Sequence, residues 1–222
     1  MRTGGRYSAN AFSAGRAGTR STGDDYVTGK LWCLATVTCC PWHPEGGCGF
    51  CRHGTYPRVK PVGTRIARWY CPTARRTLSA LPDCLASHYS GTLDDVEAHV
   101  RAVEQAPSLL AATVHLRTDI ELPGALRYLS RLCRAIHSAL RIIRGLDPAT
   151  FLTVEPSISG FANVLSTDCV LICLREQCAR HLPQLPTPLG FNLPRTKPTH
   201  STPRVQHQTG RDPPQAIVES AK

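Results

Sequence analysis

The sequence lacks a long apolar run. No stretch approaches the roughly 20 predominantly apolar residues that a transmembrane helix needs. The first 30 residues, rich in Gly, Ser, Thr, Ala and Arg, also contain no apolar segment of the secretory kind. We therefore expect a cytoplasmic protein with no membrane partner. In a reducing compartment the 11 cysteines, an odd number, are expected to be thiols or metal ligands rather than disulfides.

The sequence also lacks the patterns of common enzyme sites. The glycines at Gly46 and Gly47 are not followed by the lysine and helix of a phosphate-binding loop. A transposase of the DDE type needs three carboxylates around two metal ions, held in a catalytic domain that contains strands. We expect no strands after residue 90, so the sequence does not favour such a domain. The ten acids of residues 94–176 are expected on helix faces and at helix caps instead. We expect a non-catalytic protein with no small-molecule substrate.

Acidic residues are few. The chain has 16 acids against 26 bases, 22 of them Arg, and a net charge of +10. Residues 31–90 and 123–146 each have a net charge of +5, whereas residues 91–122 have a net charge of −4. Arginine binds phosphate with two parallel hydrogen bonds, so its excess favours nucleic acid as a partner. A basic protein without such a partner is the alternative.

The apolar pattern predicts a mainly α protein with a small N-terminal β unit like a zinc ribbon. Four segments are expected: a disordered basic N-terminus, a ribbon-like β domain, an all-α bundle and a Pro-rich disordered tail, over residues 1–30, 31–90, 91–182 and 183–222. In the β domain, residues 31–38 are expected to be a β-rich run. Thr55–Arg58 and Arg65–Tyr70 are predicted to pair as a hairpin around a turn at Gly63.

Five helices are predicted in the α domain. Thr92 and Asp95 form a capping box that begins the first helix. The other four are expected at about residues 109–117, 123–144, 156–165 and 168–182. In the longest helix apolar residues alternate by four and three, and Gly145 is expected to end it. Thr167 or Asp168 is expected to cap the last helix.

Two cysteine-containing turns are spaced as in a zinc ribbon. Cys40 and His43 form a C-x-x-H turn, and Cys71 follows at a hairpin's length. Thiolate and imidazole donors at the ends of a hairpin favour one Zn²⁺, which replaces the core that so small a unit cannot build. Zinc is therefore the expected cofactor. The scattered cysteines are expected to be small packing residues: Cys33, Cys84, Cys133, Cys169, Cys173 and Cys178.

The motif Arg52-His53-Gly54 and the segment YCPTARRTL at residues 70–78 resemble an uncharacterised bacterial zinc-ribbon family associated with insertion-sequence transposases. The resemblance covers about residues 36–192. It implies a metal-binding ribbon in a protein that works with, or derives from, a mobile element. Two positions depart from that family. Arg75 stands where a His or Cys ligand is expected, and Leu78 replaces the usual aromatic residue.

Arg75 cannot bind Zn²⁺, because the guanidinium stays protonated. Three interpretations of the fourth ligand are therefore open. Cys48 or Cys51 supplies it, or Cys39 does, or the ribbon has lost its metal. The preferred ligand set is Cys40, His43, Cys48 and Cys71. His53 is expected to be a loop histidine rather than a ligand.

Residues 92–144 are predicted to form a helix-turn-helix-like arrangement whose last helix is the longest and most basic. Arg127, Arg131 and Arg134 share a face opposite its apolar stripe, and Arg141 and Arg144 extend that face. Such a face suits DNA phosphates. The alternative is a solvated face whose arginines pair with the acids of residues 94–121. In the ribbon, the residues expected to contact DNA are Arg52, Arg58, Arg65, Arg68, Arg75 and Arg76.

These observations favour a non-catalytic, nucleoid-associated protein that binds duplex DNA through its phosphates, as an accessory to or a remnant of a mobile element. The alternative is a protein-interaction or dimerisation module. In that case the ribbon is purely structural, and the acidic and basic helices pair within a homodimer or with another protein.

Overall fold

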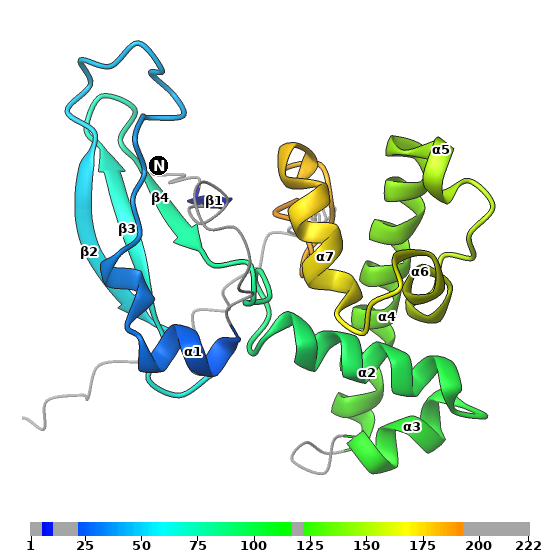
Figure 1. The fold of residues 1–222 in the computed structure, drawn as a ribbon. Helices are drawn as coiled ribbons and strands as arrows, with labels where there is room; N and C mark the ends of the chain where they lie inside the picture. The colour runs from blue at the N-terminus through cyan, green and yellow to red at the C-terminus, as the bar shows by residue number, and fades with distance from the viewer. Residues whose placement is uncertain (1–5, 11–21, 117–121, 193–222) are drawn as a thin grey trace, which may run out of the picture.

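The structure is a computed structural model that describes residues 6–10, 22–116 and 122–192. Figure 1 shows two lobes side by side, a β lobe with helix α1 and a second lobe made of helices. The chain crosses from the first lobe to the second between the end of strand β4 and the start of helix α2. The predicted fold class, mainly α with a small β unit near the N-terminus, is confirmed.

The β lobe is built on a four-stranded sheet in the order β1-β4-β3-β2. The strands are Arg6–Asn10 (β1), Cys51–Pro57 (β2), Arg65–Cys71 (β3) and Arg76–Leu81 (β4). β2, β3 and β4 are antiparallel neighbours, and β1 pairs with β4 in parallel. The predicted hairpin is confirmed as β2 and β3, and Gly63 in its turn has a φ of +83°, which glycine adopts without strain.

Helix α1, Gly23–Thr28, packs against the sheet (Figure 1). Thr22 and Asp25 form a capping box at its start. Tyr26 is 1% exposed and donates a hydrogen bond of 3.0 Å to the carbonyl of Arg65. The expected disorder of residues 1–30 is therefore wrong for β1, which pairs with β4. It is also wrong for residues 22–30, because the buried side chain of Tyr26 ties α1 to the sheet. The rest of that segment lies outside the described residues.

Residues 31–38 contain no strand. A 3-10 turn, Leu31–Cys33 (η1), replaces the expected β-rich run and buries Trp32. The indole of Trp32 lies 5.7 Å from the ring of Tyr26, and both pack on the sheet beside Trp69 and Leu78. The apolar residues of this run therefore cover the sheet instead of extending it.

The second lobe contains six α-helices and one 3-10 turn within the described residues. They are Leu93–Gln105 (α2), Leu109–Leu116 (α3), Leu122–Leu146 (α4), Pro148–Phe151 (α5), Ile158–Leu165 (α6), Val170–Gln177 (α7) and Ala179–His181 (η2). Each predicted helix is present, and α5 is an addition. Helices α2, α3 and α4 each contact the other two. Most of the turn predicted for the helix-turn-helix, near residues 119–123, lies outside the described residues.

The caps of these helices differ in part from the prediction. The capping box of Thr92 and Asp95 is confirmed at the start of α2. Gly145 does not end the longest helix, because α4 continues to Leu146. Neither Thr167 nor Asp168 is the N-cap of α7, which follows Cys169 without a side-chain cap.

The core of the helical lobe is the apolar stripe of α4, whose buried residues include Leu129, Leu132, Ile136, Leu140 and Ile143. Helices α2, α6 and α7 contribute apolar side chains to the same cluster. Among the described residues no single helix is long and apolar enough to cross a membrane. Among these residues, helices α6 and α7 taken together have the length and apolar composition of a span, but the chain bends by 69° between them.

Two glutamates of α2 hold the ends of other helices. Glu97 is 4% exposed, accepts the backbone N–H of Leu171 at 2.9 Å, and pairs with Arg101 at 2.7 Å. Glu104 accepts the backbone N–H of Ile158 at 2.9 Å and pairs with His137 at 2.8 Å. A carboxylate at a helix N-terminus satisfies free N–H groups and complements the helix dipole. The acids of α2 therefore position α6 and α7.

Arg175 of α7 joins the two lobes. Its side chain is fully buried and donates four hydrogen bonds to backbone carbonyls, those of Asp83, Leu85, Pro188 and Leu189, at 3.2, 2.5, 2.6 and 2.9 Å. Burial lowers the pKa of this guanidinium to about 10, and the charge of Asp83 opposes that shift. Arg175 is therefore charged at neutral pH. It ties α7 both to the segment that links the lobes and to the chain beyond residue 183.

The expected disorder of residues 183–222 is wrong for residues 183–192. Leu185 and Leu189 are fully buried in the helical core, and the Ser87 hydroxyl donates to the carbonyls of Pro188 and Gly190. Proline content suggested an extended tail, but the leucines between the prolines pack on α7. Residues 193–222 lie outside the described part of the chain.

Replacing Arg175 with methionine is expected to lower the free energy of unfolding by about 3–5 kcal/mol, because four buried carbonyls lose a charged donor. Denaturant unfolding followed by circular dichroism measures the change. Arg180→Met is the matched control, since Arg180 is exposed on the adjoining turn. Equal stability of the two variants would contradict the assignment of Arg175 as the joint between the lobes.

Glu104 is expected to make stability depend on acid pH. Burial raises the pKa of its carboxyl, but the hydrogen bonds from His137, Ile158 and Ser159 outweigh that effect and lower it below the ordinary 4.5. A lowered folded-state pKa stabilises the protein above pH 4.5, and the stabilisation is lost as the pH falls through the folded value. Unfolding measured against pH should show this loss in the parent and a smaller one in Glu104→Gln. Parallel curves would contradict it.

Candidate metal centre and basic surfaces

Four predicted ligands come together at the outer end of the β lobe. The ligand atoms of Cys40, His43, Cys48 and Cys71 all lie within 4.8 Å of one another. Among the described residues, this is the group of His, Cys, Asp or Glu side chains with the geometry to hold a metal ion. Cys40, Cys48 and Cys71 are 3%, 7% and 0% exposed, so the sulfurs face one another inside the protein.

The first half of the cluster is a tight turn. The backbone N–H of His43 donates to the carbonyl of Cys40 at 3.2 Å, and that of Gly46 donates to the carbonyl of His43 at 3.0 Å. Gly46 and Gly47 both have positive φ, +85° and +71°, so the chain reverses there. The turn thus returns Cys48 to the side of Cys40, although four residues separate Cys48 from His43.

The second half follows β3. Cys71 is the last residue of that strand, and its sulfur accepts the backbone N–H of Ala74 at 3.3 Å. Arg75 has a φ of +51° and is exposed, so it forms the corner of a turn rather than a wall of the cluster. The Thr73 hydroxyl donates to the carbonyl of Cys48 at 3.3 Å and joins the two halves. Arg75 therefore does not disrupt the cluster, because Cys48 supplies the fourth donor.

The spacing of the donors fits a tetrahedral metal. Nδ1 of His43 lies 3.6 Å from the sulfur of Cys40 and 3.4 Å from that of Cys71. Zinc bonds of about 2.3 Å to sulfur and about 2.0–2.1 Å to nitrogen, at a tetrahedral angle, place these atoms about 3.5–3.6 Å apart. The site therefore needs little rearrangement to take an ion of that size.

The cluster favours thiolate, the form that binds metal, at Cys40. Burial raises the pKa of the Cys40 thiol, but hydrogen bonds with His43, the backbone of Trp42, Cys48 and Cys71 outweigh it and lower the pKa to about 7. At Cys48, burial raises the pKa and outweighs the hydrogen bond from the backbone of Phe50. A cation bound by the cluster would displace the protons that remain on its thiols.

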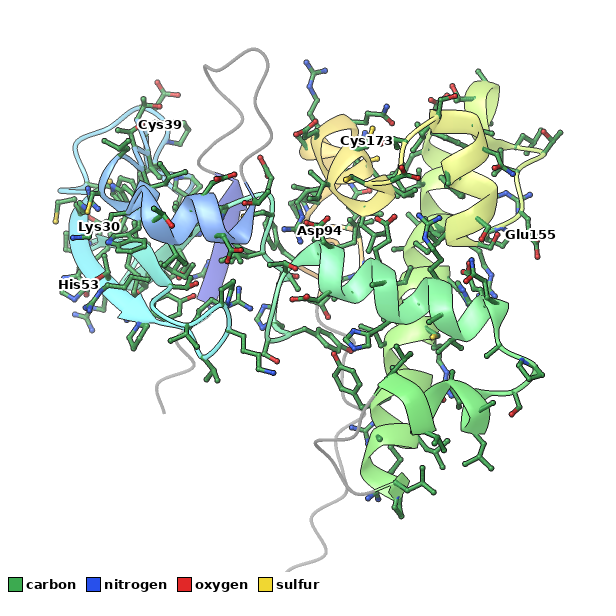
Figure 2. The ribbon with its side chains drawn as sticks, turned by 60° about the horizontal axis from the view of Figure 1, so that its bottom comes forward. Lys30, Cys39, His53, Asp94, Glu155 and Cys173 are labelled. Carbon is green, nitrogen blue, oxygen red and sulfur yellow. The ribbon has the colours of Figure 1, made fainter. Side chains whose placement is uncertain are left out.

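The alternatives for the fourth ligand are not in the cluster. Cys39 and Cys51 are exposed and do not belong to the group of four (Figure 2 labels Cys39). His53 is also exposed, and its ring lies 5.5 Å from the ring of Tyr70. The prediction that the scattered cysteines pack in the core holds for Cys84, Cys133 and Cys178, which are buried. It is wrong for the exposed Cys33 and incomplete for the half-buried Cys169 and Cys173.

Some of the ribbon arginines have structural partners. Arg52 donates to the carbonyls of Trp32 and Cys33 at 2.6 and 3.0 Å, and its guanidinium lies 5.6 Å from the Trp69 ring. Arg58 donates to the carbonyls of Ala86 and Tyr89, in the segment that links the lobes. These two arginines therefore bind the protein's own backbone, Arg52 at η1 and Arg58 in the segment that links the lobes. The others lie on the sheet or at its end: Arg65, Arg68, Arg75 and Arg76.

The arginines of α4 lie as predicted, with the exception of Arg144. Arg144 is half-buried and donates to the carbonyl of Leu152 at 2.5 Å. Arg127, Arg131, Arg134 and Arg141 are all exposed, on the face opposite the buried apolar stripe. The Nε of Arg127 donates to the carbonyl of Pro123 at 3.1 Å. Of the ion pairs formed among the described residues, Arg101–Glu97 and His137–Glu104, neither involves these four arginines.

Three residues that support the site were not predicted. Trp42, Phe50 and Ala74 pack against the three buried cysteines. The position of Ala74, three residues after Cys71, repeats the spacing between Cys40 and His43. In both turns the third residue after the cysteine contacts its sulfur, through the His43 ring in the first turn and through the Ala74 backbone N–H in the second.

Comparisons of the chain with family models, with curated proteins and with solved structures give no match.

Metal content should show whether the cluster is a binding site. Purified parent protein is expected to contain about one equivalent of metal, and Cys71→Ser is expected to lose it, since three protein ligands hold a structural ion poorly. Cys51→Ser is the matched control, because this exposed cysteine lies outside the cluster. A parent without metal, or loss only in Cys51→Ser, would contradict the ligand set.

Proposed function

We propose that this protein is a non-catalytic, zinc-stabilised DNA-binding protein that contacts the phosphates of duplex DNA through α4. The observation that carries the proposal is the line of exposed arginines Arg127, Arg131, Arg134 and Arg141 on one face of a 25-residue helix. A helix of this length, fixed along its other face by a buried stripe, presents its charges in a rigid array.

The spacing of these arginines suits a nucleic-acid backbone. The first three differ by four and three residues, so they share a face, and Arg141 lies seven residues further on. From Arg127 to Arg141 the helix rises about 21 Å, since each residue adds about 1.5 Å. Four cations along that length can neutralise several phosphates and release their counterions, which gives favourable and salt-dependent binding.

The acids nearby argue against self-neutralisation. Of the acids of residues 94–121 that the sequence offered as partners for this face, Glu97 and Glu104 bind Arg101, His137 and the N-termini of α6 and α7, and Asp95 caps α2. Their negative charge is therefore used inside the helical lobe. This leaves the described part of the arginine face available for an external anion. Asp119 and Glu121 lie outside the described residues.

The donor set supports zinc as the metal. Three thiolates and one imidazole are soft and borderline ligands, and they suit Zn²⁺ in preference to Mg²⁺ or Ca²⁺. Four protein ligands would complete the tetrahedron and leave no open position for a substrate. The metal would thus stabilise the end of the β lobe and take no part in a reaction.

A second candidate function is protein association through α3. Leu110 and Val114, one turn apart on that helix, are 51% and 56% exposed, and Leu122 at the start of α4 is 45% exposed. Exposed apolar side chains so close together in a small helical lobe are typical of an interface. This function keeps the metal site but needs no nucleic acid.

Salt dependence tests the first candidate. The triple variant Arg127→Gln, Arg131→Gln, Arg134→Gln is expected to bind a random-sequence duplex more weakly at low salt. The slope of log affinity against log salt should become shallower by about 3, because each phosphate that a cation no longer neutralises removes about 0.9 from it. Arg180→Gln, which removes an exposed arginine outside α4, is the control.

Unchanged duplex binding by the triple variant would contradict the proposal. If, in addition, light scattering shows a dimer that Leu110→Glu dissociates, the protein-association function is the correct one. Both experiments use the full chain with its metal.

A further inference from the structure

The two faces of the sheet are unequally covered. Alternate residues of a strand point to opposite faces. On β3, Ala67, Trp69 and Cys71 lie on one face, and they are buried beneath α1, η1 and the cysteine cluster. Ile66, Arg68 and Tyr70 lie on the other face, where Ile66 is fully buried and Arg68 and Tyr70 are half-buried.

Strand register extends this second face across the sheet. Tyr56 on β2 pairs with Ile66, which puts it on the same face as Arg68, and the Arg68 guanidinium lies 5.5 Å from the Tyr56 ring. On β4, Ser79 is opposite Arg68, and Thr77 is opposite Tyr70. The ring of His53 approaches Tyr70 from the β2 edge, with centroids 5.5 Å apart. We call His53, Tyr56, Arg68 and Tyr70 the aromatic face.

Core packing accounts for Tyr56, which packs against the buried cluster of the β lobe, but not for Tyr70. Trp69 and Trp32 belong to the buried cluster of the β lobe, whereas Tyr70 belongs to none of the hydrophobic clusters formed by the described residues. His53 is exposed and lies on the outer side of the β lobe, away from the helices (Figure 2). A tyrosine and a histidine are thus held in contact at the rim of the sheet without filling a core.

Strands β2, β3 and β4 contain no carboxylate. Arg68 is the arginine that these strands place on the aromatic face, since Arg65 alternates with it and the register sets Arg52 opposite Trp69 and Arg76 opposite Cys71 on the covered face. The Nε atom of Arg68 is buried without a hydrogen-bond partner among the described residues. The chemistry that matches such a surface has flat rings to stack and negative charges between them.

We propose that the aromatic face binds single-stranded nucleic acid, with a base stacked on the ring of Tyr70 and with Arg68 at the neighbouring phosphate. Tyr70 and Arg68 are two residues apart on β3, so their positions are separated by about 6.6 Å along the strand. Duplex bases are already covered above and below by their neighbours, and only unpaired bases can offer a free face to the Tyr70 ring.

This inference goes beyond the proposed function, because it assigns another surface and another form of nucleic acid. It does not depend on duplex binding by α4, and the two can fail separately. The probes are a fluorescein-labelled single strand of mixed sequence, about 12 nucleotides long to span a typical single-strand site, and the corresponding duplex. Anisotropy is measured with the full, metal-loaded chain.

Tyr70→Ala is expected to weaken single-strand binding by about 10-fold, within the range for removal of one stacked base. Tyr70→Phe keeps the ring and should bind within about twofold of the parent, because stacking needs the ring and not the hydroxyl. Both should bind duplex like the parent. The triple arginine variant of α4 provides the reverse pattern, with duplex binding weakened and single-strand binding kept.

His53→Ala guards against misfolding, because His53 is exposed and its removal leaves the core intact. It is expected to weaken single-strand binding about threefold, since it removes the ring that orients Tyr70. The proposal is overturned if the parent does not bind the single strand. It is also overturned if Tyr70→Ala and His53→Ala both bind it as tightly as the parent.

Discussion

The rest of the structure depends on the burial of Arg175. One guanidinium satisfies carbonyls from two separate stretches of chain, residues 83–85 and 188–189, and does so from a third element, α7. An isolated charge in this position would cost several kcal/mol. The four hydrogen bonds and the charge of Asp83 offset that cost. The relation between the β lobe and the helical lobe is therefore fixed by polar geometry as well as by apolar contact.

Polar groups position the helical lobe in the same way. Glu97 and Glu104 stand two turns apart on α2, and each accepts the N-terminal N–H groups of a short helix. Helices α6 and α7 have eight residues each, too few for stability on their own. Their stability comes from the α2 carboxylates and from the α4 stripe. The acidic character of α2 is thus structural, which is why the arginines of α4 are left facing solvent.

The cysteine cluster has the corresponding role at the other end of the molecule. There the apolar contacts consist of three cysteines with Trp42, Phe50 and Ala74. So small a cluster cannot hold two turns together by hydrophobic burial alone. A metal ion bound by four side chains would supply what the core lacks. The β lobe therefore has two supports, a tyrosine and tryptophan core under α1 and the cluster at the tip.

Local signals predicted much of this fold, and long-range contacts account for what they missed. The capping box at Thr92 and the periodicity of α4 are properties of adjacent residues, so the sequence shows them directly. The ligand set was also predictable, because three of its members lie within nine residues. Arg175 looked like one more surface arginine, since its partners lie up to 92 residues away. Strand β4 was missed for a similar reason, because it depends on contacts made across the sheet. Helix α1 was missed although the capping box of Thr22 and Asp25 is a local signal of the same kind as that at Thr92.

The two proposed nucleic-acid surfaces lie on different lobes, and the α4 surface is the central claim. The most direct test is an NMR titration of the metal-loaded protein with duplex DNA, observed at the arginine Nε–Hε groups. The account predicts that the resonances of Arg127, Arg131, Arg134 and Arg141 shift while that of the buried Arg175 does not. Shifts confined to arginines of the β lobe, or no shifts, would contradict it.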